Sequence, residues 1–154
     1  MAVGGTSIED EALTQKIIGC AMSVHRTLGP GFLESVYQKA LAHELQCAGL
    51  KVVCEWPIEV RYDGVNVGEF SADMLVEDRI LIENKAVQNL CMAHEVQLVH
   101  YLTATGIETG LLFNFGAASL QFKRKTRTYR PPKSPTNPVE SCESCPRAVA
   151  NEYC

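Results

Sequence analysis

The chain has 154 residues, of which 46% are hydrophobic, so it can fold as one domain around a single core and is neither disordered nor fibrous in composition. It contains no run of about 18 apolar residues, which excludes a membrane-spanning helix, and its first residues lack a secretory signal, so we expect a cytoplasmic protein. The net charge of −4 argues against strong nonspecific binding to nucleic acid.

Two helices are predicted at the start of the chain. Apolar residues recur at helical spacing over residues 8–27 and again over residues 33–48. The segment Leu28-Gly29-Pro30-Gly31 separates them, and Gly49 ends the second. We expect the two helices to pack against each other as a hairpin.

Strands follow the helices. Residues 51–62 alternate in character, and Pro57 makes this strand an edge strand or interrupts it. A hairpin turn is predicted at Asp63-Gly64, and the return strand leads into a second hairpin over residues 70–87, which turns at Glu77–Asp78. The pattern in residues 70–76 is a regular alternation.

The later elements predict a mixed sheet. A helix is expected over residues 92–104, then a nearly all-apolar strand over residues 109–115 and a last strand over residues 120–129. Helices followed by antiparallel strands and then a helical crossover indicate an α/β fold with flanking helices.

Prolines mark the end of the predicted domain. We expect residues 1–130 to form the domain and residues 131–154 to form a flexible tail. The tail carries Cys142, Cys145 and Cys154. Structural zinc usually has four ligands, so a mobile tail is favoured here over a zinc site.

Three charged residues interrupt the apolar pattern of the second hairpin. Glu83 and Lys85 are two positions apart on one strand and therefore point the same way. Asp73 lies on the neighbouring strand and can be brought opposite them. Burying two carboxylates beside an ammonium group is costly without a purpose. Carboxylates bind Mg²⁺ or Mn²⁺, and the backbone carbonyl of Asn84 can add a ligand.

A second interpretation of this pattern is an ion pair on the surface. Glu83 and Lys85 would then simply neutralise each other on one strand face. Under the metal hypothesis, Lys85 instead lies beside the attacking water or the phosphate.

Helical residues add candidates to this set. Glu34 and Tyr37 share one helix face, where Glu34 is either a solvated residue or a site residue and Tyr37 is favoured as a core aromatic. His94 and Gln97 share a face of the later helix. We favour a structural role for His94, whereas Gln97 can position water or phosphate.

The most basic stretch of the chain is residues 120–133, which holds six basic residues and no acid. Its residues can grip a phosphate backbone or can serve as solubilising charges on a strand edge. The candidates for nucleic-acid binding are Lys123, Arg124, Lys125 and Arg127.

The spacing Gly31-x-x-Glu34-x-x-Tyr37 matches the signature of the GxxExxY protein family, which resembles the PD-(D/E)XK nuclease superfamily. Further blocks over residues 8–130 follow in the same order, among them the segment from Ile82 to Lys85. Ala72 replaces the proline of the superfamily's PD dipeptide, a position that varies widely.

The resemblance implies a restriction-endonuclease-like core and assigns roles to residues. Asp73 takes the place of the metal-binding aspartate, and Glu83 and Lys85 take the places of the paired E and K. Glu34 corresponds to an acid on the first core helix, and Gln97 to a polar helix residue that joins the site. Superfamily members often dimerise, so a homodimer is one expectation.

Three functions remain open on the sequence. The leading hypothesis is a Mg²⁺- or Mn²⁺-dependent nuclease that acts on DNA or RNA. The second is a noncatalytic module that binds nucleic acid or protein, which the intact Asp/Glu/Lys set disfavours. The third is a hydrolase of smaller phosphate esters.

Overall fold

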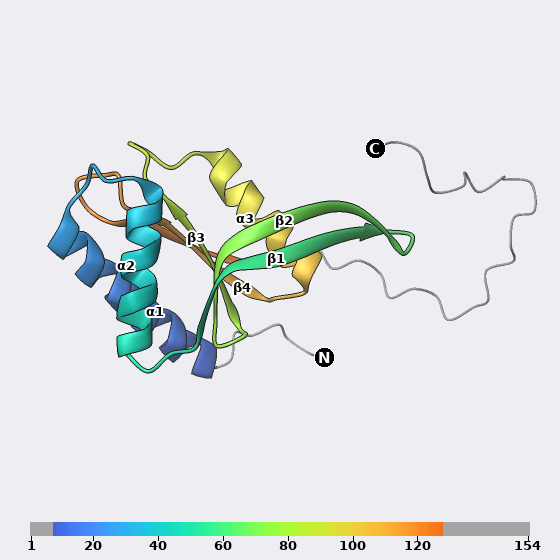
Figure 1. Ribbon diagram of the computed structural model, residues 1–154, viewed down its shortest axis with the longest axis horizontal. Coiled ribbons are helices and arrows are strands. Elements are labelled where there is room, and N and C mark those ends of the chain that lie inside the picture. The colour runs from blue at the N-terminus through green and yellow to red at the C-terminus, as the bar shows by residue number, and fades with distance from the viewer. Residues whose placement is uncertain (1–7, 128–154) are drawn as a thin grey trace, which may run out of the picture.

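Three helices flank one five-stranded sheet in the computed structural model, which describes residues 8–127 (Figure 1). The predicted tail and its three cysteines lie outside the described residues. The helices are α1 (Ile8–Leu28), α2 (Glu34–Cys47) and α3 (Met92–Thr105). The strands are β1 (Val52–Tyr62), β2 (Val65–Val76), β3 (Ile80–Lys85), β4 (Thr109–Asn114) and β5 (Gln121–Thr126).

The strands lie in the order β1-β2-β3-β4-β5. Every neighbouring pair is antiparallel except β3 and β4, which are parallel and are connected through α3. This arrangement confirms the predicted mixed sheet. Strand β1 is an edge strand, which is one of the two outcomes predicted from Pro57. Every residue of β4 is buried, as its apolar sequence indicated.

The two faces of the sheet carry separate hydrophobic clusters. Helices α1 and α2 lie side by side on one face, and α3 covers the other (Figure 1). The alternation of side chains along β3 and β4 divides their apolar residues between the two clusters. The sheet contributes Met74, Val76, Ile80, Ile82, Leu111 and Phe113 to the first cluster, and Ile58, Ala72, Leu81 and Leu112 to the second.

Helix α3 packs closely on β4 because Gly110 lacks a side chain. A Cβ atom at this position would lie 2.8 Å from a methyl carbon of Leu98. Leu98 is fully buried and therefore seats the middle of α3 directly on the strand. The contact fixes the height of α3 above the sheet, and with it the position of neighbouring Gln97.

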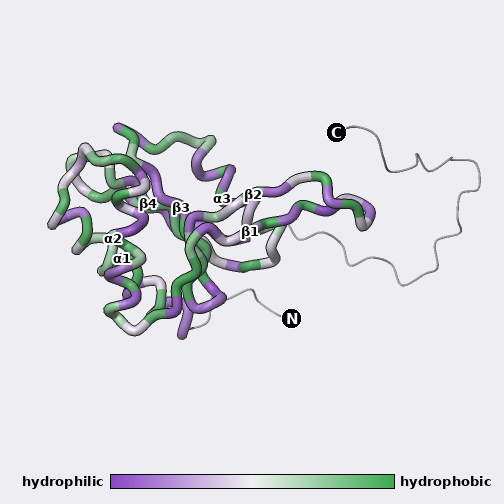
Figure 2. Tube along the Cα trace, viewed as in Figure 1, coloured by the Kyte–Doolittle hydropathy of each residue, from purple (hydrophilic) through white to green (hydrophobic). Residues whose placement is uncertain are grey.

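The hairpin formed by β1 and β2 extends away from the helices as a long arm (Figure 1). Its turn is at Asp63-Gly64, as predicted, and both residues have positive φ angles, of 51° and 76°. That combination is typical of a two-residue turn whose twist matches the strands. Figure 2 shows that the tip is hydrophilic, in contrast to the apolar strands at the centre of the sheet.

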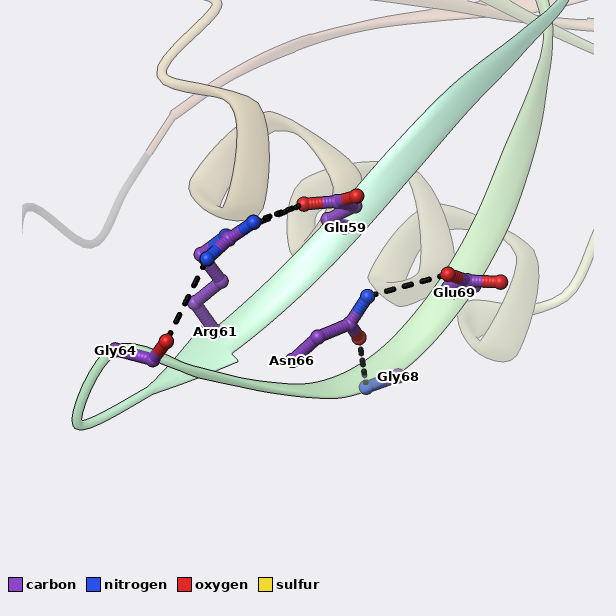
Figure 3. Close-up of polar contacts among 6 residues, drawn as sticks. All are labelled: Glu59, Arg61, Gly64, Asn66, Gly68 and Glu69. Atoms are coloured by element: carbon purple, nitrogen blue, oxygen red, sulfur yellow. Dashed lines mark hydrogen bonds and ion pairs between the residues drawn. The ribbon is translucent and has the colours of Figure 1, made fainter.

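Polar contacts along each strand hold the outer part of the arm (Figure 3). On β1, Arg61 donates a 2.8 Å hydrogen bond to Glu59 and a longer one to the carbonyl of Gly64. On β2, the side chain of Asn66 accepts from the backbone N–H of Gly68 at 3.1 Å. The arm therefore keeps its shape through local contacts, and the charge of Arg61 is compensated within it.

The predicted regular alternation along β2 is wrong at Asp73. Ala72 packs in the cluster under α3, whereas Met74, two residues later, packs in the cluster under α1 and α2. Two residues of an ideal strand at this spacing would share a face. The strand therefore turns about its own axis at Asp73, where the arm leaves the body of the sheet.

Candidate active site

The site begins where β2 and β3 separate. Their backbone pairing runs from Val76 and Ile80 to Met74 and Ile82 and goes no further. In Figure 1 the arm sweeps to one side beyond this level while β3 continues to the other. The next residues on the two strands are Asp73 and Glu83, so these carboxylates lie in the opening between the strands.

Side chains replace the backbone ladder at this opening. The backbone N–H of Asp73 donates to Oε1 of Glu83 at 3.1 Å, and the backbone N–H of Asn84 donates to Oδ2 of Asp73 at 2.7 Å. Each carboxylate therefore binds the opposite strand. The reciprocal pair fixes both carboxylates relative to each other, since neither can move without breaking a hydrogen bond.

The carboxyl group of Glu83 is buried, with only 3% of the residue exposed. Its pKa is raised to about 8: burial is the largest cause and the charges of Asp73 and Glu34 add to it, while the N–H of Asp73 and the charge of Lys85 act in the opposite direction. A surface ion pair with Lys85, the alternative open on the sequence, does not fit a residue buried to this extent.

The pKa of Asp73 is also raised. Burial is again the largest cause, and the nearby charges of Glu34 and Glu55 raise the pKa further. The N–H of Asn84 and the charge of Lys85 lower it. Acids from α2 and β1 and the lysine of β3 therefore act on the same carboxylate.

Helix α2 brings Glu34 to this cluster. Gln38, one turn further along the helix, donates a long 3.4 Å hydrogen bond to the backbone carbonyl of Asp73. Residues four apart share one helix face, so Glu34 lies on the face that meets β2. Glu34 is exposed and is the first residue of α2. The structure thus brings together Asp73, Glu83, Lys85 and Glu34, four of the five predicted site residues.

Tyr37 is a core residue, which confirms the interpretation favoured on the sequence. It is fully buried, and its ring stacks on Phe115 with ring centres 4.8 Å apart. Its hydroxyl donates to the carbonyl of Gly29 at 2.5 Å and accepts the N–H of Phe32 at 3.2 Å. Tyr37 therefore holds the loop that precedes Glu34 and sets where α2 begins.

Gln97, the fifth predicted residue, lies on α3 away from these contacts. Its amide donates to the hydroxyl of Tyr101 at 3.1 Å rather than to either carboxylate. It lines an open groove of about 840 Å³ between α3 and the arm, together with Phe70 and Tyr101, whose ring centres are 5.9 Å apart. His94 accepts the backbone N–H of Cys91 at the start of α3, which is a structural role.

Three of the four predicted phosphate-binding residues lie on β5, at the edge of the sheet opposite β1, and Arg127 directly follows the strand. Their charges are largely compensated by acids. Arg124 pairs with Glu11, Lys125 with Glu95, and Arg127 with Glu108. Lys123 is exposed, and we find no ion pair for it within residues 8–127. Of the four predicted phosphate-binding residues, Lys123 is therefore the one best placed to contact a polyanion.

Two residues near the site were missed on the sequence, Gln38 and Glu55. The signal for Gln38 was its position four residues after Glu34, on the same helix face. Glu55 gave no such signal. Its backbone has a positive φ angle of 52° in the middle of β1, and the residue pattern of a strand does not predict such an irregularity.

The donor set fits a hard divalent cation. In the described part of the chain, no three His, Cys, Asp or Glu side chains form a ready-made metal cage. Mg²⁺ rarely needs one, since it binds through one or two carboxylates and keeps several waters. Asp73 and Glu83 supply two such carboxylates. Their negative charges repel each other, and a bound cation would neutralise that repulsion.

A mixed five-stranded sheet, helices on both faces and a carboxylate pair beside a lysine where two strands part define a restriction-endonuclease-like α/β domain. The sequence profile described as the PD-(D/E)XK nuclease superfamily matches residues 11–125. The chain belongs to this superfamily, and the predicted fold class is confirmed.

A comparison with solved structures supports the fold. The chain resembles a structure titled "Crystal structure of SSO0001" with a TM-score of 0.50 and 16% sequence identity. The similarity covers 80% of this chain and 62% of that one. Identity this low shows the fold alone. No curated protein matches the sequence significantly. None of the helices within residues 8–127 is long and apolar enough to cross a membrane.

Proposed function

We propose that this protein is a metal-dependent nuclease, of the GxxExxY family, that hydrolyses phosphodiester bonds in DNA or RNA with Mg²⁺ or Mn²⁺. The observation that carries the proposal is the reciprocal bonding of Asp73 and Glu83 at the parted strands, with the charge of Lys85 acting on both. Superfamily membership supports the reaction class, and Gly31-x-x-Glu34-x-x-Tyr37 supports the family.

Asp73 and Glu83 would hold the cation, and the backbone carbonyl of Asn84 is a further oxygen at the same place on β3. When bound, the cation supplies positive charge that neutralises the phosphate and lowers the pKa of a nucleophilic water. The protein fixes the carboxylates beforehand through the two backbone N–H groups that they accept. Little reorganisation is then needed when cation and substrate arrive.

Lys85 is the positively charged side chain at the site. Its ammonium group can donate hydrogen bonds to a phosphate oxygen or to the attacking water, and it stabilises negative charge as the reaction proceeds. Glu34 is exposed at the start of α2 and acts electrostatically on both carboxylates. With a cation bound at the carboxylates, Glu34 would be placed to hydrogen-bond a water molecule or to accept a proton.

The groove between α3 and the arm offers a place for the substrate. It presents the aromatic rings of Phe70 and Tyr101 and the amide of Gln97. Unpaired bases stack on aromatic faces with little regard to sequence. A single strand or a frayed end therefore suits this groove better than an intact duplex does.

Calorimetric titration with Mg²⁺ and Mn²⁺ tests the metal site. We expect one binding event per chain, which Asp73→Ala removes. The control Asp78→Ala changes an exposed acid in the turn between β2 and β3, next to the site in sequence but paired with Lys51. Binding that survives Asp73→Ala unchanged would remove the proposed site.

Nuclease assays test the reaction itself. Labelled single-stranded, duplex and branched DNA, and RNA, are incubated with the protein and Mg²⁺, and a small phosphodiester serves as a minimal substrate. We expect Lys85→Met to lower the rate by on the order of a hundredfold or more while metal binding persists. Lys16→Met, a change at an exposed lysine of α1, is the control.

Equal cleavage by the wild type and by Lys85→Met would show that the activity belongs to a contaminant or to another site. Hydrolysis of the small phosphodiester alone would favour the hydrolase of smaller esters. Tight nucleic-acid binding with no cleavage under any metal condition would favour the noncatalytic module.

A further inference from the structure

Two side chains bind the backbone of Asp73. Its N–H is bound by Glu83, and its carbonyl accepts from Nε2 of Gln38 at 3.4 Å. The same Nε2 atom donates a much shorter bond, of 2.7 Å, to Oε1 of Glu55. One amide group of α2 thus reaches over Asp73 to the edge strand β1.

Glu55 is held from a second side. Its other carboxylate oxygen accepts the hydroxyl of Ser71 at 3.2 Å, across the β1–β2 pair. With Gln38 on one oxygen and Ser71 on the other, the carboxylate is fixed between α2 and β2. Its position is therefore determined although the residue is exposed.

The backbone of Glu55 is irregular at the position where it lies opposite Asp73. Cys54 pairs with Met74 and Trp56 with Ala72, which puts Glu55 opposite Asp73. Glu55 has a φ of 52°, in the left-handed region that residues with side chains rarely adopt. Both strands are therefore irregular at the same level, which is also the level where β2 turns from one cluster to the other.

The chemistry of the side chains suits the link. The NH₂ group of glutamine has two hydrogens, one for the Glu55 carboxylate and one for the Asp73 carbonyl. A glutamate at position 38 would have no hydrogen to donate to either the Glu55 carboxylate or the Asp73 carbonyl. Gln38 also lies one turn from Glu34, so the link that secures Gln38 also sets how far α2, and Glu34 with it, stands from Asp73.

We infer that Gln38 and Glu55 are a positioning pair, which ties α2 to β1 across Asp73 and so holds the Asp73 carboxylate and Glu34 in register for the divalent cation. The inference rests on the proposed function, because it assigns the pair a role at that site. Neither residue is proposed to touch the cation or the substrate.

Mn²⁺ binding to the folded protein separates this role from a merely structural one. A structural role would lower the melting temperature and leave the Mn²⁺ affinity of the folded protein unchanged. A positioning role weakens the affinity at a temperature where the variant is fully folded by circular dichroism. The Mn²⁺ affinity is measured by calorimetry and by the electron paramagnetic resonance signal of free Mn²⁺.

The first variant is Gln38→Met, which keeps the length of the side chain and its helix propensity but removes both donors. We expect its Mn²⁺ dissociation constant to rise about tenfold, as is common when a partner of a metal ligand is removed. Gln46→Met is the matched control, because Gln46 is an exposed glutamine two turns further along α2. It should bind Mn²⁺ as the wild type does.

The second variant exchanges the two residues, Gln38→Glu with Glu55→Gln. It keeps the net charge and lets the new amide at position 55 donate to the new carboxylate at position 38. The exchange re-forms the short bond between α2 and β1 but leaves the Asp73 carbonyl without its donor, so we expect Mn²⁺ affinity to recover in part, to about threefold below that of the wild type.

Four outcomes decide between these roles. Weak binding by Gln38→Met and recovery in the exchange variant support the positioning pair. Unchanged binding by Gln38→Met, or an exchange variant as weak as the single variant, overturns the pair and leaves the proposed function standing. A wild type that binds no Mn²⁺ through Asp73 overturns the proposed function, and the positioning role falls with it.

Discussion

Replacing Glu83 by glutamine should make the metal-free protein more stable, although Glu83 lies at the centre of the candidate site. The substitution removes a buried ionisable group and keeps the side-chain oxygen that accepts the N–H of Asp73. A neutral amide in this place resembles the protonated form of Glu83. The gain should depend on pH, because the wild-type side chain is neutral in the folded protein only while it holds its proton.

The direction in which stability changes with pH follows from whether the folded or the unfolded state binds the proton of Glu83. The pKa of Glu83 is raised from its ordinary value of 4.5 to about 8 in the folded protein. Between these values the folded state holds a proton that the unfolded state has lost, so the free energy of unfolding falls as pH rises. This contribution is fully present below pH 4.5 and is lost by about pH 8.

The size of this change in stability follows from the same shift in the pKa of Glu83. One pKa unit corresponds to about 1.4 kcal/mol, so the window from pH 5 to pH 8 costs the wild type about 4 kcal/mol at this residue. Glu83→Gln avoids that loss. The difference between the free energies of unfolding of the two proteins should therefore widen by about 4 kcal/mol over this range. A small domain has only about 5–15 kcal/mol of stability, so the effect is large.

Urea unfolding at pH 5, 6, 7 and 8 in the presence of EDTA measures this difference. A repeat with Mg²⁺ is the matched condition, since a cation that binds the two carboxylates stabilises the wild type and not the variant. A difference that stays constant from pH 5 to pH 8 would refute the burial argument. So would a variant that is less stable than the wild type at pH 8 without metal.

Two further substitutions test the frame around the site. Tyr37→Phe removes the hydroxyl that bridges Gly29 and Phe32, and urea unfolding should show a loss of about 1–2 kcal/mol; an unchanged stability would mean that the loop does not depend on this bridge. The side-chain amide of Asn84 is fully buried, and neither of its polar atoms has a partner in the part of the chain that the structure describes. Asn84→Leu should therefore raise the free energy of unfolding by about 1 kcal/mol in thermal or urea melts, and a loss of stability would contradict this account.

The elements of the fold could be predicted from local patterns. Apolar spacing located the helices, Asp63-Gly64 and Glu77–Asp78 located the turns, and Pro57 marked the edge strand. Each of these signals acts within a few residues, because helix faces, turns and the missing N–H of proline are properties of a short segment.

The candidate site was predictable in part. The spacing of Glu83 and Lys85 on one strand, and a hairpin that returns Asp73 beside them, followed from the period of a strand. The alternation could not show that β2 and β3 separate at this point. That separation depends on how the arm twists relative to the body of the sheet, and the residue pattern of a single strand does not predict this twist.

Charge along the chain was a weaker guide than charge in space. The basic stretch that begins in β5 suggested a phosphate-binding surface, but acids from three different segments pair with Arg124, Lys125 and Arg127. Those acids are far from β5 in sequence, so a local count of charges could not include them.

The sequence by itself determined the helices, the turns, the edge strand and the identity of the acids and the lysine that can carry chemistry. Each of these features depends on residues that are close together along the chain. Only the tertiary structure decided that Glu83 is buried, that Asp73 is bound from both sides, and that Gln38 meets Glu55 above it. These features arise where segments distant in sequence meet, and the free energy of packing them together, rather than any local preference, sets their positions.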